Sequence, residues 1–326
     1  MVDQTIVKKI SQKINGARKI LLLGHANPRQ DGDSLGAVLA VAHYLKSINK
    51  DFTIFSLYPA PENLSYLPGA HKMETNTEKI NILEFDLIIM LDFSELRNSG
   101  LPEKLAQAKA AGIFFIIIDH HPGEAELADL AVVRETASST CEILYNILTG
   151  LDGEITKDIA TCLLTGILTD TQNFTNAGTT FTALQISSEL LKRGAHLQEI
   201  TAHTWQNKDL PILRLWGKIL LRLHEDSKTG LVTTAITLKD LAEEQLSPEA
   251  VDGVVNFLNN LGTAKAVLLL KEETGGKVKG SLRTTKENID VRKIAQRYGG
   301  GGHRKAAGFL IPGHIVRTEE GWKVVE

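Results

Sequence analysis

The sequence predicts an α/β fold: a parallel sheet flanked by helices, then a helical linker and a smaller α/β domain. Apolar runs such as Ile113–Ile118 and Leu87–Leu91 show no alternation, which is typical of strands buried on both faces of a parallel sheet. Stretches with helical spacing of apolar residues separate these runs, so right-handed crossovers are expected. A length of 326 residues allows two domains of ordinary size.

The first domain is expected over residues 1–194. An amphipathic helix carries Ile6, Ile10 and Ile14 on one side, and a buried strand follows at Lys19–Gly24. Helical spacing continues from Ser34 to Ile48, where Asp33 can serve as the N-cap. The pattern then predicts strands at 51–57, 84–92 and 113–119 and helices at 101–111, 139–148 and 154–169.

Residues 195–228 look helical, with a polar interruption at Gln206–Asp209, and are expected to link the domains. The second domain is expected over residues 229–326. Its predicted strands lie at 231–237, 265–270 and 278–283, and its predicted helices at 248–261 and 291–298.

Composition is that of a soluble globular protein, with 43% hydrophobic and 23% charged residues and a net charge of −3. No apolar run approaches the roughly 18 residues of a membrane span, and the first residues lack the apolar centre of a secretory signal. The two cysteines, Cys141 and Cys162, lie in apolar helical patterns and are expected to be core thiols. These features favour a cytoplasmic protein that does not bind membranes.

Acids and histidines gather where the predicted strands end. In open α/β sheets, ligand sites lie at the carboxyl ends of strands, and carboxylate with imidazole suits a divalent metal. Helix capping is the alternative for Asp33 and Asp92, while Asp170 ends a buried helix, where the dipole disfavours an anion unless a cation is near. The candidate metal ligands are His25, Asp31, Asp33, Asp92, His120 and Asp170.

Two imidazoles and four carboxylates are too many ligands for one ion and suit two. Mixed nitrogen and oxygen ligands without thiolate favour Mn²⁺, with Mg²⁺, Co²⁺ or Fe²⁺ as alternatives. Two such ions can activate a water for attack on a phosphorus atom and stabilise the leaving oxygen. The sequence therefore predicts a two-metal phosphoester hydrolase.

A glycine run, GGGGHRKAAGF, occupies Gly299–Phe309 within a locally basic stretch. Four consecutive glycines let main-chain N–H groups approach an anion, with His303, Arg304 and Arg283 as charged donors. A flexible surface loop is the alternative, against which the small residues Ala306–Gly308 argue for tight packing. We expect a phosphate site here.

Five ordered motifs, GHANPRQDGDSLGA, LDFSELR, IIIDHH, TGILTDTQNF and GGGGHRKAAGF, resemble those of the DHH phosphoesterase superfamily. The last motif looks like its DHH-associated C-terminal domain. The resemblance covers nearly the whole chain, and the two-domain plan is most similar to the nanoRNases of the NrnA type. Those enzymes degrade short oligoribonucleotides and dephosphorylate 3′-phosphoadenosine 5′-phosphate.

The resemblance implies a role for each candidate residue. Asp119 orients metal ligands, and His121 faces the substrate phosphate or the leaving group. One Mn²⁺ is held by His25, Asp31 and Asp92, and the other by Asp33, Asp92, His120 and Asp170. The substrate is gripped by Arg283, Asn256, Gly300, Gly301, Gly302 and His303.

The first motif departs from the usual His-x-Asn-Pro-Asp-Gly-Asp, because Arg29 and Gln30 stand between Pro28 and Asp31. The loop must bulge, which makes His25 and Asp31 less secure ligands than Asp92 or His120. The inserted Arg29 is a candidate contact to a substrate phosphate.

The expected partners are short single-stranded RNA oligonucleotides or nucleotide phosphates, and the sequence leaves a homodimer open. Rival activities are cleavage of cyclic dinucleotides, or of linear ones such as pApA and pGpG, and a non-catalytic dinucleotide receptor. An inorganic pyrophosphatase is disfavoured by the glycine-histidine motif. A long-substrate single-strand exonuclease is disfavoured by the chain length and by the scarcity of aromatic residues.

Overall fold

The computed structural model describes residues 2–25, 30–93, 99–121, 127–251, 253–319 and 321–325. The chain forms two compact units, Met1–Asn207 and Lys208–Glu326, which we describe separately. The boundary falls inside the stretch 195–228 that the sequence assigned to a helical linker. Within that stretch, α7 (Leu197–Thr204) places Ile200 in the core of the first unit, and α8 (Leu210–Leu221) places Leu215 in a core of the second.

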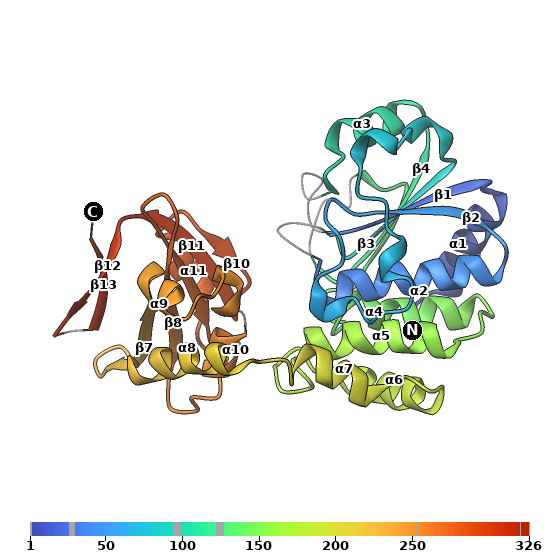
Figure 1. Ribbon diagram of the computed structural model, residues 1–326. Coiled ribbons are helices and arrows are strands. Elements are labelled where there is room, and N and C mark those ends of the chain that lie inside the picture. The colour runs from blue at the N-terminus through green and yellow to red at the C-terminus, as the bar shows by residue number, and fades with distance from the viewer. Residues whose placement is uncertain are drawn as a thin grey trace. The chain divides into compact units, whose positions relative to one another are not determined.

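A five-stranded parallel sheet in the order β2-β1-β3-β4-β5 forms the centre of the first unit (Figure 1). This confirms the parallel sheet that the apolar runs predict. The fifth strand was not predicted, because only one of its four residues, Val132, is buried. The strands are β1 (Lys19–Gly24), β2 (Asp51–Phe55), β3 (Leu87–Leu91), β4 (Phe114–Asp119) and β5 (Leu130–Val133).

Both faces of this sheet are covered, which explains the unbroken apolar runs. Alternate residues of one strand enter two different cores: Ile20 and Leu22 face the helical layer with α2 and α5, while Leu21 and Leu23 face α3. Figure 1 shows α3 on one side of the sheet and α2, α4 and α5 on the other. The helices are α1 (Gln4–Gly16), α2 (Gly32–Ser47), α3 (Pro102–Ala110), α4 (Thr140–Gly150), α5 (Lys157–Asp170) and α6 (Phe181–Lys192).

Side-chain caps fix where the helices begin. Asp31, not Asp33, is the N-cap of α2 and accepts a hydrogen bond from the Ser34 amide, so Asp33 lies inside the first turn. Ser139 caps α4 as expected, but the carboxylate of Glu142 bonds the amide of Ser138 instead of the cap residue. Within the described residues, no helix has the length and apolar character needed to cross a bilayer.

The second unit is built on a six-stranded mixed sheet in the order β10-β11-β9-β8-β7-β6, in which only β7 and β8 run parallel. The helix predicted at 248–261 is shorter: a 3-10 turn at Pro248–Val251 precedes α10 (Val254–Leu258). The other elements are β6 (His224–Asp226), β7 (Leu231–Ile236), α9 (Leu238–Glu243), β8 (Ala266–Glu273), β9 (Lys277–Arg283), α11 (Val291–Gln296), β10 (Gly301–Gly302) and β11 (Ala306–Pro312).

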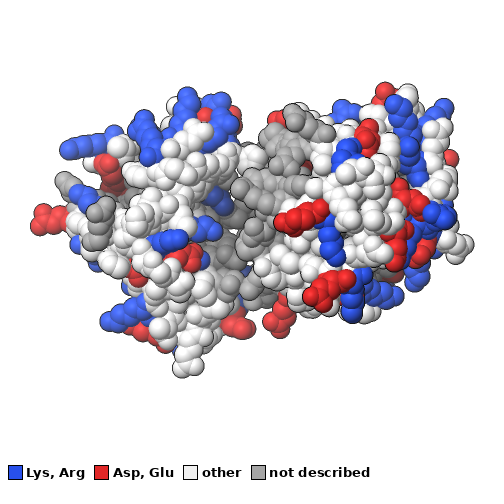
Figure 2. Space-filling view, turned by 90° about the horizontal axis from the view of Figure 1, so that it is seen from above, with Lys and Arg blue, Asp and Glu red and all other residues white. Residues whose placement is uncertain are grey.

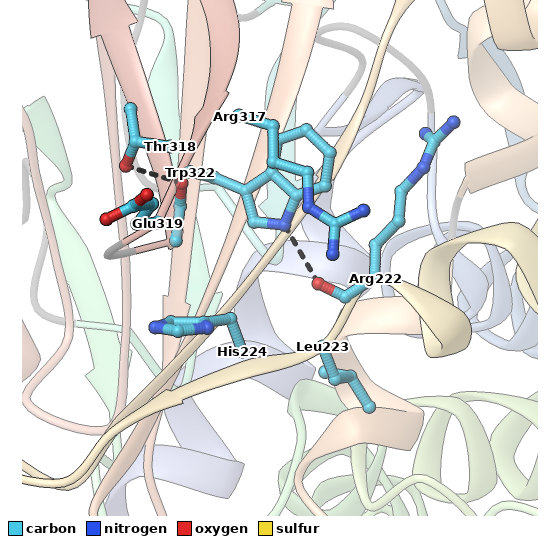
Figure 3. A pocket seen from close by; sticks show the side chains of 8 residues that line it. Arg222, Leu223, His224, Arg317, Thr318, Glu319 and Trp322 are labelled. Carbon is cyan, nitrogen blue, oxygen red and sulfur yellow. Dashed lines mark hydrogen bonds between the residues drawn. The ribbon is translucent and has the colours of Figure 1, made fainter.

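A C-terminal hairpin, β12 (His314–Thr318) and β13 (Gly321–Val325), packs against the end of α8. Trp322 Nε1 donates to the carbonyl oxygen of Arg222 at 2.8 Å, and the guanidinium groups of Arg222 and Arg317 each lie 5.7 Å from the Trp322 ring (Figure 3). A pocket of about 560 Å³ opens beside the ring, lined also by His224 and Glu319. The hairpin was not predicted from the sequence.

Candidate functional site

Three neighbouring strands deliver polar residues to one edge of the parallel sheet. His25 follows β1, Asp92 follows β3, and Asp119 is the last residue of β4, with His120 and His121 next in the chain. The order β1-β3-β4 makes these strand ends adjacent. Asp92 has a φ of 53°, a left-handed conformation that is uncommon for a residue with a side chain. This edge of the sheet is where ligands bind in open α/β folds.

Asp33 reaches the same edge from α2. Only 1% of it is exposed, and its carboxylate accepts hydrogen bonds from the Thr140 amide at 2.6 Å and the Cys141 amide at 2.9 Å. These amides belong to the first turn of α4, whose unbonded N–H groups and dipole favour an anion. The fold thus stabilises a buried carboxylate that points toward the strand ends.

Asp170 is the last residue of α5, which packs closely against α2. A Cβ on Gly36 would collide with the Cys162 carbonyl oxygen, and one on Gly166 would meet the Cys141 sulfur and lie 2.7 Å from Asp33 Oδ1. Glycine at both positions lets the helix backbones approach. The carboxylates of Asp33 and Asp170 therefore meet across the two helices.

His120 lies at the centre of one group. Its Nε2 is 3.1 Å from an oxygen of Asp170 and 3.8 Å from oxygens of Asp33 and Asp92. None of these oxygens is aligned for a hydrogen bond, so this buried nitrogen has no hydrogen-bond partner among the described residues. A nitrogen that faces three carboxylates without bonding to any of them is positioned as a metal ligand would be.

His121 belongs to a second group. Its Nδ1 lies 3.3 Å from Oδ1 of Asp92 and 3.1 Å from Oδ1 of Asp119. Its ring packs edge-on against that of His120, with 4.0 Å between the ring centroids. Asp119 also accepts from the amides of His121 and Phe93 at 2.8 and 2.7 Å. Asp119 therefore holds both the backbone and the ring of His121, as expected of a residue that orients a functional side chain.

Crowding of acids shifts the protonation of the whole cluster. Burial and repulsion from Asp92 and Asp170 raise the pKa of Asp33 well above its usual value, and the same causes raise the pKa of Asp31 to about 7 although its side chain reaches solvent. Burial alone would lower the histidine pKa values. The nearby carboxylates of Asp170 and Asp33 raise that of His120 to about 9, and bonds to Asp119 and Asp92 raise that of His121 to about 11. A cluster with this excess of negative charge is suited to binding cations.

The structure brings four of the six candidate metal ligands into close groups and leaves two outside them. Donor atoms of Asp33, His120 and Asp170 lie within 4.8 Å of one another, as do those of Asp92, His120 and His121. Neither group of described residues includes His25 or Asp31. His25 is half-buried and Asp31 caps α2, with its charge close enough to Asp92 and Asp170 to affect the shared protonation. Arg29 lies outside the described residues.

In the second unit, Arg283 and Asn256 form one cluster. Arg283 Nε donates to Asn256 Oδ1 at 3.0 Å, which joins β9 to α10. Burial lowers the pKa of the half-buried Arg283 guanidinium, and no carboxylate pairs with it in the described part of the chain. This cation is suited to an anionic ligand.

The glycine run is packed at Gly300 and Gly302, whereas a Cβ on Gly299 or Gly301 would meet no atom within 4 Å. Gly300 approaches the Gly308 carbonyl so closely that a Cβ would collide with it, and Gly301 and Gly302 pair with β11. The amides of Gly300 and His303 donate to the carbonyl oxygens of Ala295 and Ala306, so these two donors are already engaged. His303 itself is exposed at the end of β10. Figure 2 shows several Lys and Arg side chains on the second unit, the left-hand body of that view.

Comparison with known proteins decides the family. Residues 19–167 match the DHH family, N-terminal domain, and residues 228–320 match the DHHA1 domain. The chain is 31% identical to the bifunctional oligoribonuclease and PAP phosphatase NrnA of Thermus thermophilus, over 94% of this chain and 88% of that one. The chain belongs to the DHH phosphoesterase family. It is therefore a hydrolase of phosphoester bonds.

Two further relatives extend the likeness. A protein of the same description from Mycoplasma genitalium is 28% identical over 93% of this chain and 92% of its own length. A crystal structure of an exopolyphosphatase-related protein from Bacteroides fragilis superposes with a TM-score of 0.88 at 25% identity, covering 96% of this chain and 93% of that one. The likeness thus extends over nearly the whole length of this DHH protein.

Sequence reasoning missed part of this DHH site. The Thr140 and Cys141 amides that bind Asp33, and the glycines that bring α2 and α5 together, were not foreseen. The Ser-x-x-Glu signal located the start of α4 but not what its first turn faces, since that contact spans 107 residues. Gly36 and Gly166 inside helical patterns were the available signal, because a helical glycine often marks close packing.

Proposed function

We propose that this DHH phosphoesterase is a Mn²⁺-dependent enzyme that hydrolyses short oligoribonucleotides and 3′-phosphoadenosine 5′-phosphate. The observation that carries the proposal is the convergence of Asp33, Asp92, His120 and Asp170 at one sheet edge, with His120 Nε2 lacking a hydrogen-bond partner among the described residues. The substrate class is supported by the relatives from Thermus and Mycoplasma, which are bifunctional oligoribonucleases and PAP phosphatases.

Residues of the first unit would hold two divalent cations. Asp33, Asp92, His120 and Asp170 are proposed for one, and His25, Asp31 and Asp92 for the other, with Asp92 shared. Bound there, the cations would lower the pKa of a water and stabilise charge on the phosphoryl oxygens. Mn²⁺ is proposed over Zn²⁺ because the donor set is oxygen-rich and contains no thiolate; Cys141 and Cys162 are buried free thiols.

The chain's own side chains would act around that centre. Asp119 fixes His121 through two hydrogen bonds, so the imidazole is held in one orientation. We propose that His121 contacts the substrate phosphate or the leaving oxygen from this fixed position. The amides of Thr140 and Cys141 keep the Asp33 carboxylate in place.

Substrate capture is proposed for the second unit. Arg283, oriented by Asn256, would bind a phosphate through its charged fork, and His303 with Gly300, Gly301 and Gly302 would complete the grip. The amides of Gly300 and His303 already donate hydrogen bonds within the fold. We therefore propose that side chains, more than main-chain amides, bind the phosphate. A cytoplasmic location is also proposed, since both thiols are unpaired.

The test is a substrate panel incubated with Mn²⁺: pApA, the cyclic dinucleotide, 3′-phosphoadenosine 5′-phosphate and pyrophosphate. We expect cleavage of pApA and release of phosphate from 3′-phosphoadenosine 5′-phosphate. Asp92→Ala should abolish turnover of every substrate, whereas His303→Ala should mainly raise KM. The matched control is Asp51→Ala, which removes an exposed aspartate at the start of β2 and should leave turnover unchanged.

Cleavage of pyrophosphate alone would overturn the proposed substrate class. Full activity of Asp92→Ala, or equal turnover after complete removal of divalent metal, would overturn the proposed metal centre.

A further inference from the structure

Gln30 is a buried carboxamide without a partner. Only 4% of the residue is exposed, and neither Nε2 nor Oε1 has a hydrogen-bond partner among the described residues. Buried polar side chains are nearly always bonded, and leaving such a group unsatisfied disfavours the folded state. A glutamine held in this state needs an explanation.

The carboxamide lies at the end of β1, next to the first turn of α2. Its Nε2 and the Ser34 hydroxyl both approach the point where a Cβ on Gly24 would stand, at the end of β1. The same Ser34 donates through its hydroxyl to the His25 carbonyl and through its amide to the Asp31 carboxylate. Gln30 Nε2 therefore lies near the serine that binds the main chain of His25 and the carboxylate of Asp31.

Gln30 is also one of the two residues by which this chain departs from the usual first motif of DHH proteins. The insertion does not push its side chain into solvent, as a simple loop extension would. It buries a neutral amide immediately before Asp31 and three residues before Asp33, two of the clustered acids. A neutral oxygen or N–H donor can interact with a hydrated cation without adding to the repulsion among those acids.

We propose that Gln30 belongs to the metal centre and that its carboxamide contacts the hydrated cation that His25 and Asp31 would hold. This inference rests on the proposed function, because it requires a divalent cation at that position. Gln30 is a positioning residue in this scheme. The unsatisfied amide gains its missing partner only when the cation is present.

Mn²⁺ affinity, measured by titration calorimetry on the full chain, tests the inference. Gln30→Leu keeps the side-chain size and removes the polar atoms; we expect affinity for one Mn²⁺ to fall about tenfold. The melting temperature of the metal-free variant should be unchanged or higher, because an unsatisfied buried group is removed. Gln30→Glu retains an oxygen donor and should bind Mn²⁺ at least as tightly as the natural protein.

Ser187→Ala provides the control. Ser187 in α6 is another buried side chain without a partner among the described residues, and its removal should leave Mn²⁺ affinity unchanged. Affinity of Gln30→Leu within twofold of the natural protein would overturn the inference. An equal loss in Gln30→Leu and Gln30→Glu, with lowered melting temperatures in both, would assign Gln30 to packing and also overturn it. If the natural protein binds no Mn²⁺, the proposed function itself fails.

Discussion

Individual residues of this site are held by partners that come from distant parts of the chain. Asp92 sits in a left-handed conformation, and its carboxylate lies 3.4 Å from the Thr140 hydroxyl and close to both histidines. Strained backbone persists only where the surrounding structure imposes it, and it concentrates at functional sites. The strain at Asp92 therefore agrees with its proposed place between the two cations.

Asp119 allows orientation to be separated from metal binding. Its carboxylate accepts from the His121 amide, the His121 ring and the Phe93 amide. Asp119→Asn leaves one accepting oxygen, so we expect His121 to lose its fixed orientation and kcat to fall by about 10–100-fold. Affinity for Mn²⁺ should fall much less than in Asp92→Ala, since Asp119 is not a proposed ligand. Steady-state kinetics measures kcat, and calorimetry measures the affinity for Mn²⁺. A loss of Mn²⁺ affinity as large as that of Asp92→Ala would contradict this role.

At the scale of elements, the site depends on how closely helices approach. Among the described helices of the first unit, α2 and α5 share the most extensive contact, and Gly36 and Gly166 lie within it. The backbone amides in the first turn of α4 add hydrogen bonds to the Asp33 carboxylate. Helix packing thus sets the distances among carboxylates that the strand ends alone would not define.

Gly166→Ala tests this packing. The added Cβ would lie 2.7 Å from Asp33 Oδ1 and even nearer the Cys141 sulfur. Overpacking should lower the free energy of unfolding by about 1–3 kcal/mol, even though alanine favours helix, and should also reduce activity. Urea denaturation measures the first effect. The control is Gly217→Ala in α8, where a Cβ meets no atom within 4 Å and stability should rise slightly; equal behaviour of the two variants would refute the packing account.

The second unit contains an acid-sensitive link between elements. Arg222, at the end of α8, donates to both oxygens of Asp240 in α9, at 2.5 and 2.7 Å (Figure 3 shows the arginine). Burial would raise the pKa of Asp240, but hydrogen bonds from Arg222 and Thr237 lower it to about 2. The folded-state pKa is depressed, so this stabilisation is complete above the ordinary value of 3.8 and is lost as pH falls toward 2.

Asp240→Asn should therefore lower unfolding free energy at pH 7 by about 1–2 kcal/mol, less than for a fully buried pair because Arg222 is partly exposed. The difference from the natural protein should shrink between pH 4 and about pH 2. Urea unfolding followed by tryptophan fluorescence measures it. Asp209→Asn is the control, since Asp209 is exposed and makes no side-chain cap. A difference that does not change with pH would rule out the ionised pair as its source.

For the molecule as a whole, local patterns predicted some features and long-range packing determined the others. The strands before His25, Asp92 and His120 were predictable because each is a short apolar run buried on both faces. The C-terminal hairpin was not, since its strands are half-exposed and carry no strong alternation. Periodicity showed α7 and α8 as helices, but which core each joins depends on contacts far along the chain. The same limit hid the amides that bind Asp33.

Metal removal should affect the two units differently. Every proposed metal ligand lies in Met1–Asn207, so a bound cation stabilises that unit by mass action, about 2.7 kcal/mol at a concentration 100 times the Kd. Adding Mn²⁺ should slow amide hydrogen exchange in α2 and α5, which carry Asp33 and Asp170, and leave β8 and β9 unchanged.

Exchange measured by mass spectrometry resolves these segments, and excess chelator should restore the original rates. Asp92→Ala is the control and should show no Mn²⁺-dependent protection in α2 or α5, because Asp92 is the ligand proposed to be shared by both cations. Equal protection of β8 and β9 would mean that the cation stabilises both units together. Unchanged exchange in α2 and α5 would instead show that the cluster of acids binds no cation at all, because ligands drawn from two helices cannot be tied together without restraining both.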